Sequence, residues 1–268
     1  MNRITTLWLT LLSSLSVGLA GNGEARIEDV AFTAACDGTE QLYVLMLPAN
    51  IQPEKPHDLL IALHGHGSDR WQFVRDPRDE CRAARDVAAA HGMIYVSPDY
   101  RAKTSWMGPK AEADVAQIIG DLKRQHQVRR VFVCGGSMGG TASLTFAALH
   151  PDLVNGVAAM NGTANLVEFD KFQDAIAASF GGSKTTVPLE YKKRSAEFHT
   201  DRLTMPVGIT AGGKDRVVLP QSVLRLAGAL EALGRDVLLI HRENTGHSTA
   251  YSDAQAILEF AIAKAHKE

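Results

Sequence analysis

Segments with strand character alternate with segments of helical spacing along most of this chain. The strand-like segments are 28–35, 40–47, 58–63, 93–99, 129–135, 155–162, 206–213 and 236–243, and the helix-like segments are 80–90, 112–125, 141–150, 220–234 and 253–265. The first two strand segments, joined by a short turn at 36–39, are expected to pair antiparallel. Several later strands are short apolar runs, which is typical of buried parallel strands. The alternation predicts an α/β fold with one mostly parallel, twisted sheet and helices on both faces.

Residues 163–204 interrupt this alternation between the sixth and seventh strand segments. This stretch is richer in charged side chains than its surroundings. Elsewhere the sequence contains no internal repeat, low-complexity tract or Pro/Ser-rich linker that divides the chain. We therefore expect a single domain over 26–268, with 163–204 as a small insertion after the sixth strand.

The first 25 residues have the pattern of a signal peptide. An arginine near the start is followed by an uncharged apolar stretch over 4–20, and the tripeptides ending at Ala20 and Ala25 fit the small-x-Ala rule for cleavage. The alternative is a membrane anchor, but the stretch is short for a span and contains Ser and Thr. The pattern predicts cleavage after Ala20 or Ala25, and a mature protein that is secreted or periplasmic.

The charge and the cysteine content indicate which binding partners and which disulfide bonds are compatible with the sequence. The net charge is −2, and no long run of one sign occurs. This argues against a nucleic-acid partner and against binding to a membrane once the signal peptide is removed. Three cysteines are present. Export is compatible with a bridge between Cys36 and Cys81, whereas Cys134 has the pattern of a buried strand residue. The pairing and the oligomeric state stay open at this stage.

A glycine-rich turn around Ser137 is the strongest functional signal. Four glycines surround this serine directly after an apolar strand segment. The turn lacks the Lys-Ser/Thr of a phosphate-binding P-loop, and it comes too late in the fold for a dinucleotide fingerprint. Gly135-x-Ser137-x-Gly139 between a strand and a helix instead matches a nucleophile elbow. Such a turn strains the backbone of the serine and projects its hydroxyl above the sheet.

An acid and a histidine follow Ser137 in the order that this architecture uses. Asp215 comes directly after a predicted strand, and His247 lies in the loop after the next strand. All three residues are thus expected at the same sheet edge, as a triad in which the histidine takes the proton of the serine. The rival assignments are a turn or helix-capping role for Asp215, and Glu243 as the acid.

An oxyanion hole requires two backbone donors near Ser137. The N–H of Met138, the residue after the nucleophile, is expected to supply one. The loop after the third strand is expected to supply the other, from His66 or alternatively from Gly67. His64 and His66 are separated by one residue and could be interpreted as a pair of metal ligands, but two ligands without a third do not make a metal site. The proposed chemistry needs neither a metal nor a cofactor.

Two tryptophans near this sheet edge are candidates for substrate contact. Trp106 follows the fourth strand segment, and Trp71 follows the oxyanion loop. Either side chain is equally compatible with a packed loop aromatic. The triplet Asn161-Gly162-Thr163 also matches a glycosylation sequon.

These residues resemble the α/β-hydrolase superfamily over roughly 27–265. Within it, the stretch 190–237 is similar to the catalytic module of prolyl-oligopeptidase-type enzymes and their esterase relatives, including dienelactone-hydrolase-like proteins and esterases that remove feruloyl or acetyl groups from plant polysaccharides. The resemblance implies a triad of Ser137, Asp215 and His247. The peptidases of this group carry a large domain ahead of the catalytic module, whereas only a short segment precedes the third strand here. The sequence also lacks the lipase HGGG pattern.

We therefore expect a serine hydrolase that cleaves carboxylic esters through an acyl-enzyme, with a small-molecule or polysaccharide ester as substrate. The alternatives are a peptidase that acts on short peptides, a non-catalytic binding protein that retains the fold, and an acyltransferase. An acyltransferase would use the same residues, so only its products would distinguish it.

Overall fold

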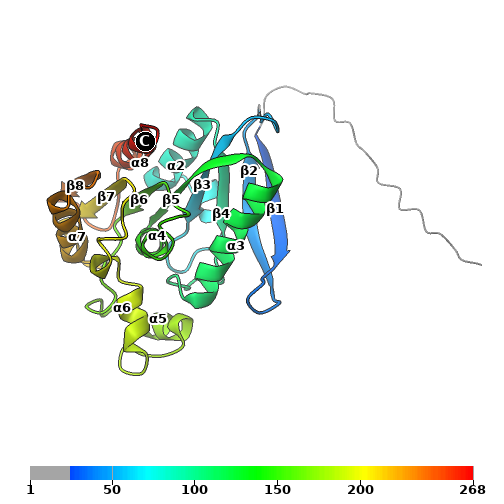
Figure 1. Ribbon diagram of the computed structural model, residues 1–268. Helices are drawn as coiled ribbons and strands as arrows, with labels where there is room; N and C mark the ends of the chain where they lie inside the picture. Colours follow the sequence, from blue (N-terminus) through cyan, green and yellow to red (C-terminus); the bar gives the residue numbers. More distant parts are fainter. Residues whose placement is uncertain (1–24, 50, 268) are drawn as a thin grey trace, which may run out of the picture.

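The chain folds around one continuous sheet, shown in the computed structural model of Figure 1, which describes residues 25–49 and 51–267. The predicted signal peptide lies outside the described residues, apart from Ala25 at its end. Within the described ranges, no helix has the length and apolar character needed to cross a membrane.

The sheet has eight strands in the order β1-β2-β4-β3-β5-β6-β7-β8. The strands are β1 (Arg26–Thr33), β2 (Glu40–Leu47), β3 (His57–Leu63), β4 (Ile94–Pro98), β5 (Val128–Gly136), β6 (Gly156–Met160), β7 (Val207–Gly212) and β8 (Val237–Arg242). β2 runs antiparallel to both of its neighbours, β1 and β4. All other pairs are parallel. The predicted fold class, a mostly parallel sheet with an antiparallel start, is confirmed.

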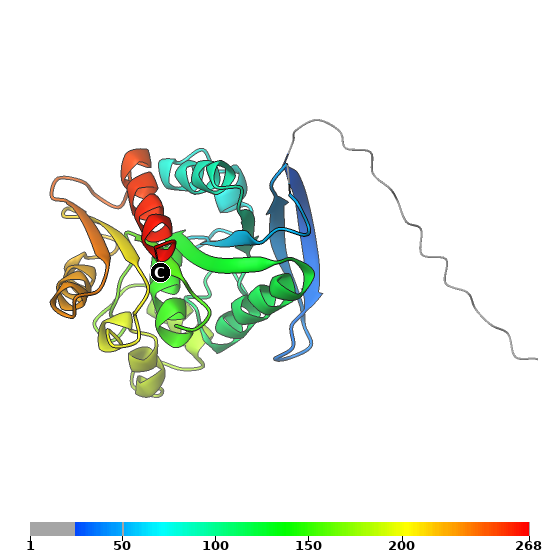
Figure 2. The same ribbon diagram turned by 45° about the horizontal axis from the view of Figure 1, so that its top comes forward.

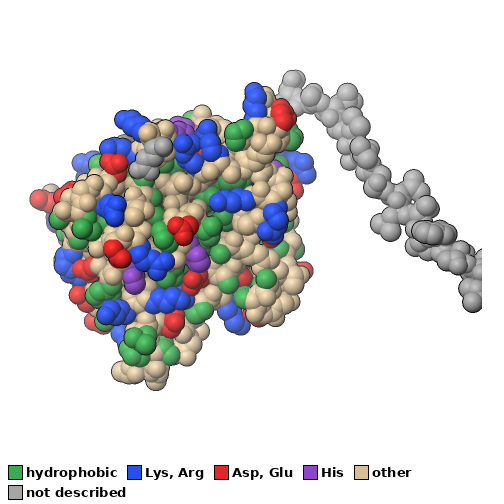
Figure 3. Space-filling view, in the orientation of Figure 1, with side chains coloured by type: hydrophobic (Ala, Val, Ile, Leu, Met, Phe, Trp, Pro, Cys, Tyr) green, Lys and Arg blue, Asp and Glu red, His purple; other side chains and the backbone are tan. Residues whose placement is uncertain are grey.

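Helices cover both faces of this sheet. They are α1 (Gln72–Arg75), α2 (Asp79–Ala90), α3 (Pro109–Gln125), α4 (Met138–Leu149), α5 (Gln173–Phe180), α6 (Pro188–Lys193), α7 (Gln221–Ala232) and α8 (Tyr251–Ala265), with a 3-10 turn η1 (Ala196–Phe198). α2 and α8 lie side by side on one face (Figures 1 and 2), and their apolar residues form one buried cluster. α3, α4 and α7 pack on the other face in a second cluster. On the face drawn in Figure 3, acidic and basic side chains are interspersed.

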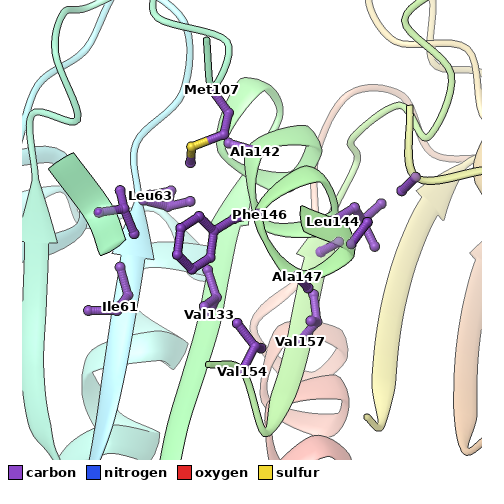
Figure 4. Close-up of a cluster of buried hydrophobic side chains, with 14 of the residues drawn as sticks. Ile61, Leu63, Met107, Val133, Ala142, Leu144, Phe146, Ala147, Val154 and Val157 are labelled. Carbon is purple, nitrogen blue, oxygen red and sulfur yellow. The ribbon is translucent and has the colours of Figure 1, made fainter. Parts of the chain in front are cut away.

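α4 lies at the centre of the fold, and nearly all of its residues are buried. Phe146 projects from this helix toward β3 and β5, where Figure 4 shows it among Leu63, Val133 and Met107. Truncation of a fully buried Phe to Ala typically costs about 3–5 kcal/mol of stability. Because α4 starts at the residue after Ser137, this packing also fixes the position of the nucleophile turn.

The connection between β6 and β7 carries α5, α6 and η1. It covers the stretch that the sequence identifies as an insertion, and it is anchored by Arg194, whose side chain is fully buried. One guanidinium nitrogen lies 2.7 Å from Oε2 of Glu112 in α3, and another donates to the carbonyl of Met107 at 2.7 Å. The insertion is thereby attached both to α3 and to the loop before it.

All three cysteines are free thiols. Cys36 is exposed and lies 3.1 Å from a guanidinium nitrogen of Arg101, whereas Cys81 and Cys134 are buried in the cluster under α2 and α8. The bridge between Cys36 and Cys81 that the sequence left open is therefore not present in this structure.

Candidate active site

Ser137 forms the turn between β5 and α4. Its backbone has φ 58° and ψ −119°, a combination with positive φ that lies outside the regions that residues with a side chain favour. Because this conformation costs free energy, it persists only where surrounding packing enforces it, and such strain is concentrated at functional sites. The main-chain N–H of Ser137 donates to the carbonyl of Met160 at 2.8 Å, which ties the turn to β6.

Two glycines make the tight approach of strand and helix possible. A Cβ on Gly135 would lie 2.5 Å from the carbonyl carbon of Gly139. A Cβ on Gly139 would collide with the carbonyl oxygen of Leu63 in β3. Any larger residue at either position would push α4 away from the sheet and displace Ser137, so the G-x-S-x-G spacing has a direct steric cause here.

Asp215 and His247 come together at the carboxyl edge of β7 and β8. Nδ1 of His247 lies 2.6 Å from Oδ2 of Asp215. The other carboxylate oxygen, Oδ1, accepts the main-chain N–H groups of Val217 and Val218 at 2.8 and 2.9 Å. These bonds hold the carboxylate in one orientation, and because Asp215 is only 3% exposed, water competes little with them. The rival acid, Glu243, is exposed.

Two of the expected oxyanion donors, the N–H groups of Met138 and His66, can be compared with their neighbours by their hydrogen bonds. Met138 is the first residue of α4, and first-turn N–H groups have no acceptor within their own helix. In the loop after β3, the N–H of Gly67 donates to the carbonyl of Lys103 at 2.7 Å and that of Gly65 donates to Oε1 of Gln72 at 2.7 Å. The N–H of His66 has no acceptor among the residues that the structure describes. Of the two alternatives from the sequence, His66 rather than Gly67 therefore retains a free donor.

The His66 side chain is held by aromatic residues. Trp106 donates from Nε1 to Nδ1 of His66 at 3.0 Å, and the ring of Phe172 from the insertion lies 4.3 Å from the imidazole, centroid to centroid. Trp106 itself is fully buried, so it presents no surface to a substrate. It is a packed loop aromatic that contacts the loop after β3, which corrects the expectation of a substrate contact.

Trp71 has a different environment. It is half-buried beside α1, and the guanidinium of Arg75 stacks on its ring at 3.6 Å from the centroid. Trp71 is not among the residues that line the pocket around Ser137. The expected substrate contact therefore has no geometric support at this position either.

Ser137 and His247 line a common pocket of about 60 Å³. The other lining residues are Gly65, Gln72, Phe73, Arg78, Glu80, Gly136, Met160, Asn161, Ser248 and Thr249. A more open groove of about 580 Å³ adjoins it on the His247 side, with charged side chains such as Arg78, Glu80, Arg242 and Asp253 in its walls. The small pocket and the polar groove share five lining residues, among them Arg78, Glu80 and His247.

Several residues that line the pocket are not indicated as pocket residues by any sequence pattern. Gln72, in the short helix α1, accepts the main-chain N–H of Gly65 in the loop after β3, and Arg78 and Glu80 lie at the start of α2. Asn161 was noticed only as part of a sequon, but it is buried at the end of β6 and is not accessible to a glycosyl group. None of these residues lies in a motif that indicates a role at the pocket, so only the three-dimensional arrangement reveals them.

Among the described residues, no third potential metal ligand joins His64 and His66. His64 is buried, and its two ring nitrogens face the carbonyl oxygens of Gly65 at 2.9 Å and Asp99 at 3.2 Å. Desolvation lowers the pKa of His64 and of His66. Across the described residues, no cluster of three or more potential metal ligands occurs.

The fold is shared with known hydrolases. Puromycin hydrolase superimposes with a TM-score of 0.73 at 19% identity over 91% of this chain. The fluorophosphonate-binding serine hydrolase F of Staphylococcus aureus gives 0.71 at 17% identity, covering 89% of this chain and 99% of its own. A ferulic acid esterase gives 0.70 at 16% identity, covering 91% and 98%. The chain spans only 39% of the length of puromycin hydrolase and 36% of a longer structure from Bacteroides ovatus.

The family model described as the prolyl oligopeptidase family matches residues 81–265, well over half of the chain. This range contains the serine turn, the acid and the histidine. The chain therefore belongs to the prolyl oligopeptidase family, and it is a serine hydrolase with the α/β-hydrolase fold.

Proposed function

We propose that this protein is a carboxylic ester hydrolase that works through a triad of Ser137, His247 and Asp215. The observation that carries the proposal is the strained Ser137 turn in one pocket with His247, whose Nδ1 lies 2.6 Å from the Asp215 carboxylate. A serine hydroxyl becomes an effective nucleophile when a positioned base removes its proton.

In the proposed acylation step, His247 Nε2 takes the proton of Ser137 Oγ as that oxygen attacks the ester carbonyl carbon. Asp215 holds the ring with its Nδ1 proton inward and stabilises the imidazolium that forms. The negative charge that develops on the carbonyl oxygen is bound by the N–H groups of Met138 and His66. Loss of one such donor typically lowers kcat about 10²- to 10³-fold. His247 then protonates the departing alcohol, and water later releases the acyl group from Ser137.

The shape of the site supports a short acyl group on a hydrophilic alcohol. The pocket of about 60 Å³ beside Ser137 suits an acyl group of a few carbon atoms. The charged groove of about 580 Å³ lies beside His247, the group that protonates the leaving alcohol. Acyl groups on a polysaccharide meet both requirements, and the predicted signal peptide supports a secreted or periplasmic enzyme that reaches such substrates.

A peptidase is the second candidate, because the chain belongs to a family named for an oligopeptidase. The acylaminoacyl peptidase of Pyrococcus horikoshii also shares the fold, with a TM-score of 0.69 at 15% identity. A peptidase would use the same triad, with the charged groove holding the peptide beyond the scissile amide.

The deciding experiment measures initial rates of purified protein on short and long acyl esters, acetylated xylan, feruloylated sugars and a short peptide amide. Ser137→Ala serves as the blank. Cleavage of short esters and acetylated xylan that is lost in Ser137→Ala supports the proposal. Faster cleavage of the amide than of the esters favours the peptidase, and activity that persists in Ser137→Ala excludes the triad.

A further inference from the structure

Asn161 is a buried polar residue in the wall of the Ser137 pocket that the triad does not use. It follows the last residue of β6, is 7% exposed, and lines the pocket together with Ser137 and His247. Its backbone has φ 47°, which is uncommon for a residue with a side chain. The neighbouring residue, Met160, accepts the main-chain N–H of Ser137, so Asn161 lies directly beside the nucleophile turn.

The side-chain amide of Asn161 is fixed by its nitrogen. Nδ2 donates to Oγ1 of Thr249 at 2.7 Å, and this hydroxyl is also bonded to Oγ1 of Thr210 at 2.8 Å. Because Thr249 lies two residues after His247, the same contact links Asn161 to the loop that carries the catalytic imidazole. The position of the amide is therefore set relative to both Ser137 and His247.

The oxygen of this amide has no partner. Among the described residues, Oδ1 is buried and accepts no hydrogen bond from the protein. A buried acceptor without a donor costs free energy, so this oxygen calls for a donor that the protein itself does not supply. Here the cost of the unpaired oxygen adds to the cost of a left-handed backbone at the same residue. Both costs are explained if a ligand of the active site supplies the missing donor.

The chemistry of the site identifies this donor. The oxyanion hole consists of N–H donors, so an acceptor such as Asn161 Oδ1 has no role in binding the oxyanion. Water is the second reactant of ester hydrolysis, and it must be oriented with one proton toward His247 and its oxygen toward the acyl carbon. A cavity needs about 10–15 Å³ of water-accessible volume to hold one water molecule, and the pocket of about 60 Å³ provides this beside a short acyl group.

We propose that Asn161 Oδ1 binds and orients the water that hydrolyses the acyl-enzyme. This inference rests on the proposed function, because it requires the acyl-Ser137 intermediate. The water oxygen forms a bond to the acyl carbon while His247 Nε2 takes one of its protons. The second proton stays on this oxygen and donates a hydrogen bond to Asn161 Oδ1. The tetrahedral intermediate then collapses, the bond between the acyl carbon and Ser137 Oγ breaks, and His247 returns the proton to Oγ. The second proton leaves with the carboxylic acid.

The test separates acylation from deacylation by stopped-flow measurement of p-nitrophenyl acetate cleavage. Asn161→Gly removes the amide and tolerates the left-handed backbone. We expect its deacylation rate to fall about 10- to 100-fold, as for the loss of one hydrogen bond to a reacting group. Acylation should stay within about twofold, so kcat and KM should fall together with kcat/KM unchanged. Mass spectrometry after a rapid acid quench should then show acetylated Ser137 accumulating.

Three further variants control for the loss of the acceptor, for misfolding and for effects outside the pocket. Asn161→Asp retains an acceptor and should deacylate within a few-fold of the natural protein. Asn161→Ala is the second truncation if the glycine variant does not fold. Asn165→Gly, which removes another buried asparagine of the same connection outside the Ser137 pocket, should leave the ratio of the two rates unchanged.

A fall in kcat/KM that equals the fall in kcat, without acyl-enzyme, would overturn the inference, because Asn161 would then act in acylation. Unchanged rates would overturn it as well. A loss restricted to esters whose acyl chain carries a hydroxyl would assign the oxygen to substrate recognition instead. None of these outcomes affects the proposed function, which is tested separately by the activity of Ser137→Ala and by the relative rates of ester and amide cleavage.

Discussion

Asp215 contacts His247 with one carboxylate oxygen, Oδ2, at 2.6 Å, and uses the other to accept two main-chain N–H groups of its own turn. The turn therefore orients the carboxylate independently of its contact with the imidazole. The sequence left open whether Asp215 is a turn residue or the acid beside the histidine. In the structure it has both contacts, one on each oxygen.

Asp215→Asn should lower kcat by about 10³- to 10⁴-fold, because an amide at this position favours the wrong tautomer of His247. KM should change little. Steady-state kinetics on a short acyl ester measure both values. Glu243→Gln is the matched control: it removes the rival acid, which is exposed, and should retain nearly full activity. Equal losses in the two variants would contradict the assignment of the acid.

Trp106→Phe should lower kcat about tenfold while the protein remains folded. The substitution keeps an aromatic ring in the core but removes the Nε1–H that donates to His66 Nδ1 at 3.0 Å. The His66 loop then loses one of the contacts that would orient its main-chain N–H toward the oxyanion. A misplaced oxyanion donor lowers kcat more than it weakens substrate binding. Trp71→Phe controls for the loss of an indole, since Trp71 stacks on Arg75 outside the pocket. Equal kcat values for the two variants would show that the Trp106 bond does not matter.

Features encoded by local sequence were predictable, and features made by distant contacts were not. The eight strands and the five longer helices follow from periodicity, and the Ser137 turn follows from glycine spacing. α5 and α6 lie in a charged stretch with weak periodicity, and they are held by the burial of Arg194 against Glu112, which local sequence does not show. The pocket wall is similar: Asn161 and Gln72 acquire their positions from Thr249 and Gly65, far along the chain.

The Arg194–Glu112 pair predicts a loss of stability in acid. Burial would raise the pKa of Glu112, but the hydrogen bond with His150 and the charge of Arg194 together lower it to about 2, against an ordinary value of 4.5. A carboxyl whose pKa is lower in the folded state stabilises the fold above its unfolded pKa and loses this contribution as the pH falls. Urea unfolding at a series of pH values should therefore show a decline between about pH 4.5 and pH 2 that is smaller in Glu112→Gln.

At neutral pH, Glu112→Gln should itself destabilise the protein by about 1–3 kcal/mol, because the buried Arg194 loses one of its two carboxylate partners and keeps only Glu190, at 3.1 Å. Arg82→Gln is the control. It breaks a pair between α2 residues whose side chains are each about half exposed, and such pairs contribute about 0–1 kcal/mol. If the two substitutions reduce the free energy of unfolding equally, the buried pair does not anchor the insertion.

The three thiols should differ sharply in their reaction with a disulfide reagent such as DTNB at pH 8. Cys36 is exposed, whereas desolvation raises the pKa of the Cys81 thiol to about 12 and raises that of Cys134 further. The thiolate is the reactive form, so the two buried residues should be inert in the folded protein. We expect one thiol to react per folded chain and three after unfolding in guanidinium chloride, and the fast reaction should disappear in Cys36→Ser. One reactive thiol after unfolding would instead reveal a disulfide bond. Cys36 and Cys81 could form such a bond only if Cys36 moved away from Arg101 and Cys81 moved out of the core.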